Sequence, residues 1–169
     1  MSDELADRLV SASQIRGDFV LSSGRRSNVY FDKFRFLTDP DLLKDTAEGV
    51  AGLLPEGITH LAAPEGAATL LVAAVSLETS LPIAVVRKEP KAYGTMSQVE
   101  GHAPAGAEIA LIEDVSTTGA QVLSAARVLE DARCTVGIIV LAIDRGGGAY
   151  LREAGYWVKA LVEIEPSEV

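Results

Sequence analysis

Short aliphatic runs alternate with helix-like segments along the chain from Ile58 onward. The aliphatic runs have few polar interruptions, which is typical of parallel strands that are buried on both faces of a sheet. We predict strands at 58–63, 83–87, 109–114, 136–144 and 156–164, and helices at 66–79, 120–132 and 147–155. This alternation predicts an α/β fold with a mostly parallel central sheet and helices on both faces.

The first 55 residues have a different pattern. They predict an amphipathic helix, a hairpin with its turn near Ser23–Gly24, and a second helix, at 3–13, 19–32 and 39–54. The second helix has Asp39 as its N-cap and Pro40 as its first residue. We interpret residues 1–55 as a small hood on the sheet. Residues 56–169 form the core of one domain that spans 1–169.

Composition and charge narrow the class of protein. The chain has 169 residues, 48% of them hydrophobic, which fits one globular domain. Its 15 Lys and Arg against 24 Asp and Glu give a net charge of −9, which argues against binding nucleic acid. Cys134 is the only cysteine, and we expect it in the core. Because we find no secretory pattern or membrane-length apolar run, we expect a cytoplasmic protein with no membrane partner.

The clearest chemical signal is the segment 109–121, IALIEDVSTTGAQ. A strand leads into Glu113 and Asp114, and the small polar loop Ser116–Ala120 opens a helix. Backbone N–H groups of such a loop, with the helix dipole behind them, form a cradle for phosphate. Carboxylates one sugar length away suit ribose hydroxyls, so the segment predicts a site for ribose 5-phosphate. The alternative is a solvated acidic pair before a Thr-rich helix cap.

The loop 88–108 is the second signal, because structureless loops of this length in a compact domain often act as lids. Arg87, Lys88 and Lys91 concentrate positive charge at its start, where they could reach an anion. The alternative is a solvated loop with incidental lysines.

Two further segments follow predicted strands at the edge where parallel sheets bind ligands. The strand-to-helix loop APEGAAT (63–69) could offer N–H groups to a second phosphate. Arg145, in IDRGGG, could read a carboxylate or imide with its forked guanidinium. The alternative for Arg145 is a surface ion pair with Asp144 or Glu153.

Four stretches together resemble a known family. IALIEDVSTTGAQ is similar to the phosphoribosyl pyrophosphate (PRPP) motif of type I phosphoribosyltransferases. FVLSSGRRSNVYFD (19–32), VVRKEPKAYGT (85–95) and IDRGGG (143–148) resemble, in the same order, segments of orotate phosphoribosyltransferases. The resemblance implies the type I phosphoribosyltransferase fold and a pentosyl transfer from PRPP to orotate in pyrimidine biosynthesis. A type I enzyme for another base, or a regulator that binds PRPP without turnover, are the alternatives.

The resemblance also implies roles for individual residues. Glu113, Asp114 and Lys91 would be catalytic. PRPP would be bound by Arg87, Lys88, Lys91, Tyr93, Glu113, Asp114, Val115, Ser116, Thr117, Thr118, Gly119 and Ala120. Orotate would be bound by Arg145, Thr117, Tyr30 and Phe31. Mg²⁺ would be held through PRPP and water, and a homodimer would share loop 88–108 across its interface. Tyr93 stands where the family often has His, and Glu65 adds an unexpected anion to the pyrophosphate loop.

Overall fold

The computed structural model describes residues 3–20, 24, 26–90 and 97–164. Within these ranges the main sheet has six strands in the order β5-β4-β3-β6-β7-β8, and all neighbours are parallel except β4 and β5. The strands are β3 (His60–Pro64), β4 (Ile83–Val86), β5 (Val99–Gly101), β6 (Glu108–Ser116), β7 (Thr135–Asp144) and β8 (Val158–Glu163). The topology confirms the predicted α/β fold with a mostly parallel sheet.

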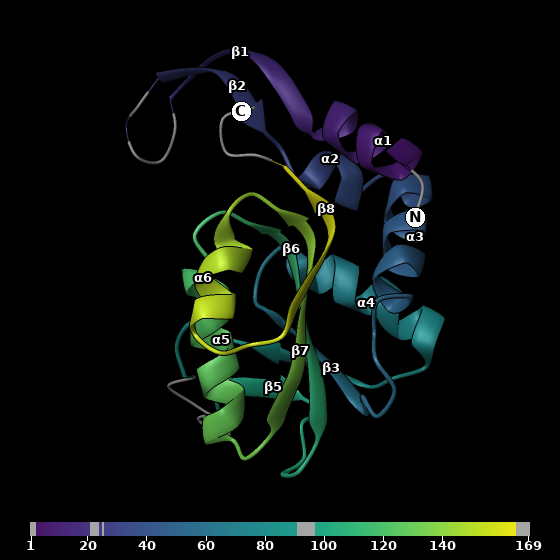
Figure 1. The fold of residues 1–169 in the computed structure, drawn as a ribbon, viewed down its shortest axis with the longest axis vertical. Coiled ribbons are helices and arrows are strands. Elements are labelled where there is room, and N and C mark those ends of the chain that lie inside the picture. The colour runs from purple at the N-terminus through teal and green to yellow at the C-terminus, as the bar shows by residue number, and fades with distance from the viewer. Residues whose placement is uncertain (1–2, 21–23, 25, 91–96, 165–169) are drawn as a thin grey trace.

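Helices cover both faces of this sheet (Figure 1). One face carries α4 (Ala68–Thr79), and the other carries α5 (Ala120–Asp131) and α6 (Gly147–Glu153). Because successive strand residues point to opposite faces, Ala110 and Ile112 of β6 join the core under α4, while Ile109 and Leu111 join the core under α5. The sheet therefore separates two apolar cores, and its strands are aliphatic on both faces.

The hood consists of α1 (Asp3–Ser13), the antiparallel hairpin of β1 (Gln14–Val20) and β2 (Arg26–Phe31), α2 (Phe34–Leu37) and α3 (Pro40–Ala51). Asp39 caps α3 as predicted, because its Oδ1 accepts hydrogen bonds from the N–H groups of Asp41 and Leu42 at 3.1 and 3.0 Å. Leu9 and Phe36 are fully buried in the core under α4. The helices of the hood thus complete that core, while the hairpin extends beyond the sheet (Figure 1).

Two predicted elements of the hood differ in their bounds, and a third element was not predicted. The hairpin begins at Gln14 and not at residue 19, since α1 passes into β1 without a loop and the register shifts between Arg16 and Phe19. The second hood helix ends at Ala51, before Gly52. The short helix α2 has too few residues to show a helical period, and the sequence pattern did not predict it.

The loop 88–108 is not structureless where it is described. It contains β5, which pairs with β4, and its last residue Glu108 opens β6. The N–H of Arg87 donates to the carbonyl of Gln98 at 2.8 Å, which closes the segment at its base. A three-residue edge strand depends on its partner for its hydrogen bonds, so no local pattern predicts it. None of the helices in the described ranges is both long and apolar enough to cross a membrane.

Candidate active site

The loop after β6 forms a cradle at the carboxyl edge of the sheet. It borders a cavity of about 110 Å³, lined by Lys33, Glu113, Val115, Ser116, Thr117, Thr118, Gly119, Gln121 and Val122. Thr117 and Thr118 are exposed, so their hydroxyl groups are available to a ligand. Gly119 has a left-handed φ of 74° at the N-cap of α5, and a Cβ there would lie 2.7 Å from the carbonyl oxygen of Gly147. Only glycine fits this turn, which brings the loop over the helix N-terminus.

Asp114 lies beneath this cavity and is completely buried. Its Oδ1 accepts hydrogen bonds from Lys33 Nζ at 3.0 Å and from the N–H of Val115 at 2.6 Å. Its Oδ2 is buried without a hydrogen-bond partner among the described residues. Lys33 stands at the N-cap of α2, 81 positions away in sequence, so the hood supplies the counter-charge for the acid.

Glu113 behaves differently from its neighbour. Burial, and then the charge of Asp114, raise the pKa of Glu113 to about 8. At neutral pH the Glu113 carboxyl group therefore holds its proton and can donate a hydrogen bond. The pair carries one negative charge and one proton, although two adjacent carboxylates in the sequence suggest two charges.

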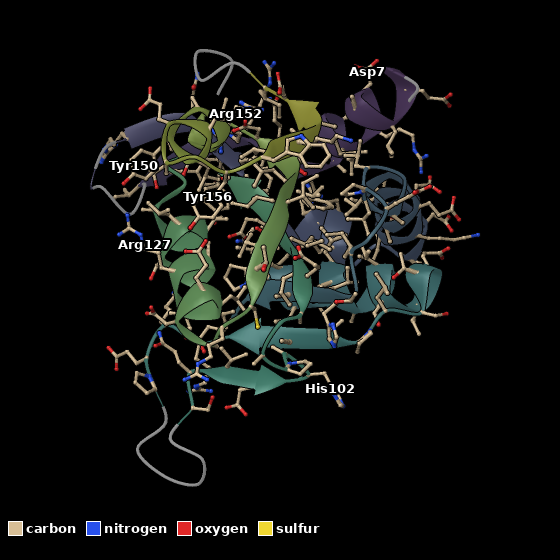
Figure 2. All side chains as sticks on the ribbon, turned by 60° about the horizontal axis from the view of Figure 1, so that its bottom comes forward. Asp7, His102, Arg127, Tyr150, Arg152 and Tyr156 are labelled. Carbon is tan, nitrogen blue, oxygen red and sulfur yellow. The ribbon has the colours of Figure 1, made fainter. Side chains whose placement is uncertain are left out.

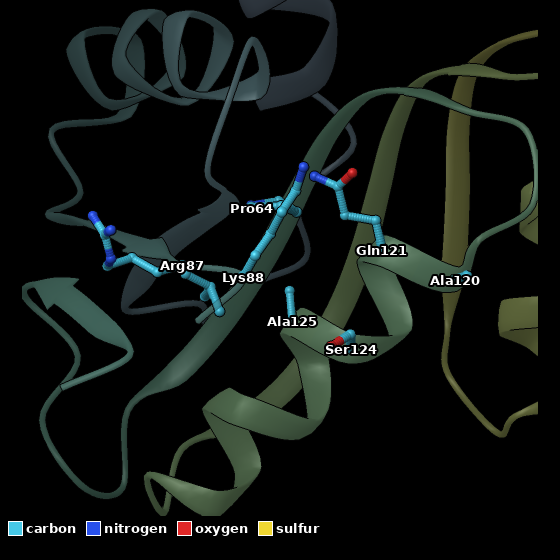
Figure 3. A pocket seen from close by; sticks show the side chains of 8 residues that line it. Pro64, Arg87, Lys88, Ala120, Gln121, Ser124 and Ala125 are labelled. Atoms are coloured by element: carbon cyan, nitrogen blue, oxygen red, sulfur yellow. The ribbon is translucent and has the colours of Figure 1, made fainter. Parts of the chain in front are cut away.

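A second cavity, of about 300 Å³, lies between the end of β4 and α5 (Figure 3). Its lining is Pro64, Val86, Arg87, Lys88, Ala120, Gln121, Ser124 and Ala125. Gln121 lines both cavities, so the two adjoin there. Figure 3 shows the Lys88 side chain directed toward Gln121, whereas Arg87 turns the other way.

Glu65 links the two strand ends that border this cavity. Its Oε1 accepts the N–H of Lys88 at 2.9 Å, and its Oε2 lies 4.0 Å from Arg87 Nη1. The carboxylate that seemed out of place in an anion-binding loop therefore sits beside the cations predicted to bind that anion. It holds the Lys88 backbone in place and partly offsets the charge of Arg87.

Arg145 follows β7 and reaches the same edge of the sheet. The backbone N–H of Arg145 donates a hydrogen bond to the carbonyl of Ser116 at 2.8 Å. Its guanidinium carbon lies 4.9 Å from the centroid of the Phe31 ring. Partial burial lowers the pKa of Arg145, and its Nε is buried without a partner among the described residues. Asp144 instead accepts from the N–H groups of Gly146 and Gly148, both at 2.9 Å.

The structure brings together most of the residues predicted for the site. The ring of Tyr30 lies near that of Phe19, with 5.4 Å between their centroids, whereas the prediction for orotate concerned the Tyr30 backbone. Lys91 and Tyr93 lie outside the described residues. Both histidines lie apart from the site: His60 opens β3 at the far end of the strand, and His102 is exposed at the sheet edge (Figure 2).

Sequence reasoning missed Lys33. Its signal was a single lysine directly after the predicted hairpin, in the stretch YFDKF. Nothing in that stretch indicates a partner 81 residues away, so only the fold reveals the ion pair with Asp114.

Comparisons with known proteins agree with this site. The chain is 44% identical over 151 residues to the orotate phosphoribosyltransferase of Thermococcus gammatolerans, covering 87% of this chain and 80% of the relative. It is 37% identical over 166 residues to that of Methanocella arvoryzae, covering 96% and 95%. The solved orotate phosphoribosyltransferase of Aeropyrum pernix matches with a TM-score of 0.80 and 34% identity, over 95% of this chain and 93% of that one. No family model matches the chain.

The agreement in fold extends over nearly the whole of the solved relative, hood included, and this defines the class: a type I phosphoribosyltransferase. Within that class, the three relatives named above are all orotate phosphoribosyltransferases. The chain belongs to the orotate phosphoribosyltransferase family, whose members are pentosyltransferases.

Proposed function

We propose that the protein transfers the ribose 5-phosphate unit of PRPP to orotate in pyrimidine biosynthesis, giving orotidine 5′-monophosphate and pyrophosphate. One observation carries this proposal: the backbone N–H of Arg145 donates a hydrogen bond to the carbonyl of Ser116, which joins Arg145 to the cradle. A site suited to a sugar phosphate therefore adjoins a cation suited to a planar, carboxylate-bearing base. An enzyme that joins these two substrates needs this adjacency.

PRPP spans the two adjoining cavities in this proposal. Its 5-phosphate binds to the loop Ser116–Ala120 and the dipole of α5, and its ribose hydroxyl groups bind to Glu113 and Asp114. The pyrophosphate extends past Gln121 toward the loop 63–67 and the cations after β4, Arg87 and Lys88. Lys91 and Tyr93 would bind the same group. The protonated Glu113 can donate a hydrogen bond to a ribose oxygen, while Asp114 accepts one from a ribose hydroxyl group. The pair can therefore satisfy both the acceptor and the donor of the ribose hydroxyl groups.

Orotate binds between Arg145 and the hood. The guanidinium fork of Arg145 pairs with the orotate carboxylate, while the Phe31 ring keeps the fork in place from its other side. Thr117 and the backbone around Tyr30 complete this side of the site. The partial burial of Arg145 strengthens its interaction with an anion, because less water competes.

The reaction follows from this placement of charge. The bond between the anomeric carbon and pyrophosphate breaks, pyrophosphate leaves with the bonding electrons, and the ribose takes on oxocarbenium character. The orotate ring nitrogen then forms the new bond from the opposite face and gives up its proton to the departing pyrophosphate or to water, with no covalent enzyme intermediate. Arg87 and Lys88 stabilise the charge that develops on pyrophosphate, and closure of loop 88–108 excludes water that would hydrolyse PRPP.

Mg²⁺ is the cofactor that we propose, held by PRPP oxygens and water. When bound, it would offset the negative charge of the leaving pyrophosphate. The cradle fits such an ion in the chemistry of its donors, because the exposed Thr117 and Thr118 hydroxyl groups are hard oxygen donors that would suit the water shell of Mg²⁺. We further propose a cytoplasmic homodimer in which loop 88–108 of one subunit serves the site of its neighbour.

A panel of bases tests the function. Purified protein is incubated with PRPP, Mg²⁺ and one of orotate, uracil, adenine, guanine or hypoxanthine, and pyrophosphate release is followed. We expect release with orotate at least about 10²-fold faster than with any other base, because only orotate offers a carboxylate to Arg145. Equal or faster release with another base would assign the enzyme to that base. PRPP binding without release for any base would make the protein a non-catalytic PRPP-binding regulator.

A further inference from the structure

The cavity beside the cradle contains a cation that no sequence pattern indicated. Of the residues that line this cavity, Lys33 is the one with a positive charge. In a chain with a net charge of −9, a cation at the place where a phosphate would bind has a large effect on the local potential.

The backbone at Lys33 is fixed from both sides. The N–H of the preceding Asp32 donates to the carbonyl of Ser13 at 2.8 Å, and Phe36 and Leu37 of α2 are buried in the core. The Lys33 carbonyl in turn accepts the N–H of Leu37 at 3.2 Å. This anchoring sets the point from which the long side chain reaches the cavity.

Asp114 fixes the other end of the side chain. The Lys33 ammonium group lies 3.0 Å from Asp114 Oδ1, and Asp114 is completely buried while the Lys33 side chain remains 39% exposed. An ammonium group has three N–H donors, and Asp114 takes one of them. Asp114 therefore lies behind Lys33, and the remaining donors are available on the side of the cavity.

We propose that Lys33 is a substrate-binding residue whose ammonium group, held by Asp114, pairs with the phosphate bound in the cradle. This inference rests on the proposed function only for the identity of the ligand, a sugar 5-phosphate. The main chain of the cradle supplies N–H donors and a dipole, and Lys33 supplies the full positive charge from the hood. The hood thereby takes part in binding the sugar phosphate as well as the base.

The test measures binding and not turnover, so it remains decisive even if no base supports catalysis. Inorganic phosphate and ribose 5-phosphate are titrated separately into the full chain, and the amide signal of Gly119 reports binding in the cradle by NMR. The variants are Lys33→Met, Lys33→Arg and, as a matched control, Lys44→Met, whose exposed lysine pairs with Glu48 on α3.

We expect Lys33→Met to lower the affinity for both ligands about 10-fold or more, because a charge-assisted hydrogen bond to phosphate is lost. Lys33→Arg should keep most of the affinity, and Lys44→Met should leave it unchanged. If Lys33→Met weakens ribose 5-phosphate but not inorganic phosphate, Lys33 only positions Asp114 for the ribose, and the proposal is wrong. Unchanged affinity for both ligands would overturn it as well.

A second pair of variants covers the case in which Lys33→Met fails to fold because Asp114 is left with an unpaired buried charge. Asp114→Asn retains Lys33 and should retain phosphate binding at Gly119. Lys33→Met combined with Asp114→Asn removes both charges together, and it should lose phosphate binding about 10-fold or more relative to Asp114→Asn. Equal phosphate affinity in these two variants contradicts the proposal.

Discussion

Glu113 and Asp114 are adjacent in the sequence but differ in their electrostatic surroundings. Asp114 has the ammonium group of Lys33 at 3.0 Å, whereas Glu113 is buried beside the charge of Asp114. Burial disfavours the charged form of Glu113, and the neighbouring charge adds to that effect. The two carboxyl groups are therefore not interchangeable, and their substitutions should have different effects on catalysis.

We expect Asp114→Asn and Glu113→Gln together to reduce turnover at least about 10²-fold, through lost positioning of the ribose. At pH 7 most of this loss should come from Asp114→Asn, because a glutamine amide can replace the donor of a protonated Glu113. We would measure steady-state rates of pyrophosphate release for the two single variants and the double variant. These rates give the share of the lost turnover that each substitution causes. A double variant with turnover near that of the wild type would exclude the acid pair from the reaction.

Glu113 also makes the stability of the fold depend on pH. Its pKa is about 8 in the folded protein, against an ordinary value of 4.5, so between these values the unfolded chain has released a proton that the folded one retains. Stability from this group is therefore present below pH 4.5 and falls as the pH rises toward 8. We expect Glu113→Gln to remove this loss and to raise Tm at pH 8 by a few degrees, on the scale of about 2–4 °C per kcal/mol.

Thermal unfolding of wild type and variant at pH 5 and pH 8 measures this effect. The gain from Glu113→Gln should be larger at pH 8 than at pH 5. Glu153→Gln, at an exposed position on α6, is the control, and its effect should not grow between the two pH values. The same difference in Tm at both pH values for Glu113→Gln would mean that Glu113 is ionised in the folded protein.

Arg145 should determine affinity for the base. We expect Arg145→Ala to raise the orotate KM and to lower kcat/KM about 10²-fold or more, or about 3 kcal/mol, while PRPP affinity changes little. Arg145→Lys keeps the charge but not the planar fork over Phe31, so it should restore only part of the activity. Calorimetric binding of PRPP to both variants checks the assignment, and loss of PRPP binding with intact orotate binding would reverse the two subsites.

Among the structural elements, those with a clear period could be predicted from the sequence. The strands β6 and β7 have nine and ten residues with aliphatic interiors, and α5 has an apolar face, so the hydrophobic pattern alone places them. β5 and α2 have three and four residues, and they owe their form to β4 and to the buried Phe36 and Leu37. Their form depends on contacts between distant segments, which no local pattern contains.

The same distinction applies to the site. The cradle was predictable because strand, acid pair, loop and helix are contiguous in the sequence. The contact of Arg145 with Phe31, the ion pair of Lys33 with Asp114, and the proton on Glu113 all depend on residues that only the fold brings together. The sequence therefore indicates which groups are present, and the structure gives their protonation and their partners.

The turn at Gly119 should be the most sensitive part of the cradle to added bulk. Gly119→Ala places a Cβ in a left-handed residue and against the Gly147 carbonyl oxygen at 2.7 Å. We expect a loss of unfolding free energy of about 1–3 kcal/mol from backbone strain, with further loss from the overlap. Gly106→Ala is the matched control, because Gly106 has a similar φ of 85° and open space around its Cβ position.

Urea denaturation of the two variants separates strain from overlap. Gly119→Ala should lose more stability than Gly106→Ala and should also lose phosphate binding, while Gly106→Ala should bind phosphate as the wild type does. Equal losses of stability in the two variants would show that packing of α6 against the cradle contributes nothing to the turn.

At the scale of the whole molecule, the proposed dimer determines which subunit completes each active site. A loop that carries Lys91 into its own site and one that carries it into the neighbouring site are indistinguishable in the sequence. Two variants with defects in different parts of the shared site resolve the question: Lys91→Ala in the loop and Asp114→Asn in the acid pair. Each variant alone should be nearly inactive if the two residues act at every site.

Subunit exchange between these variants gives the last prediction. In a two-fold dimer with shared loops, a hybrid has one site that collects both defects and one site that has neither. Random mixing makes half of the dimers hybrids, so about a quarter of all sites should regain activity. Mass spectrometry of isotope-labelled subunits provides the control that exchange has occurred. If exchange is complete and activity stays at the level of the separate variants, each loop serves its own subunit, since every site then retains one defect.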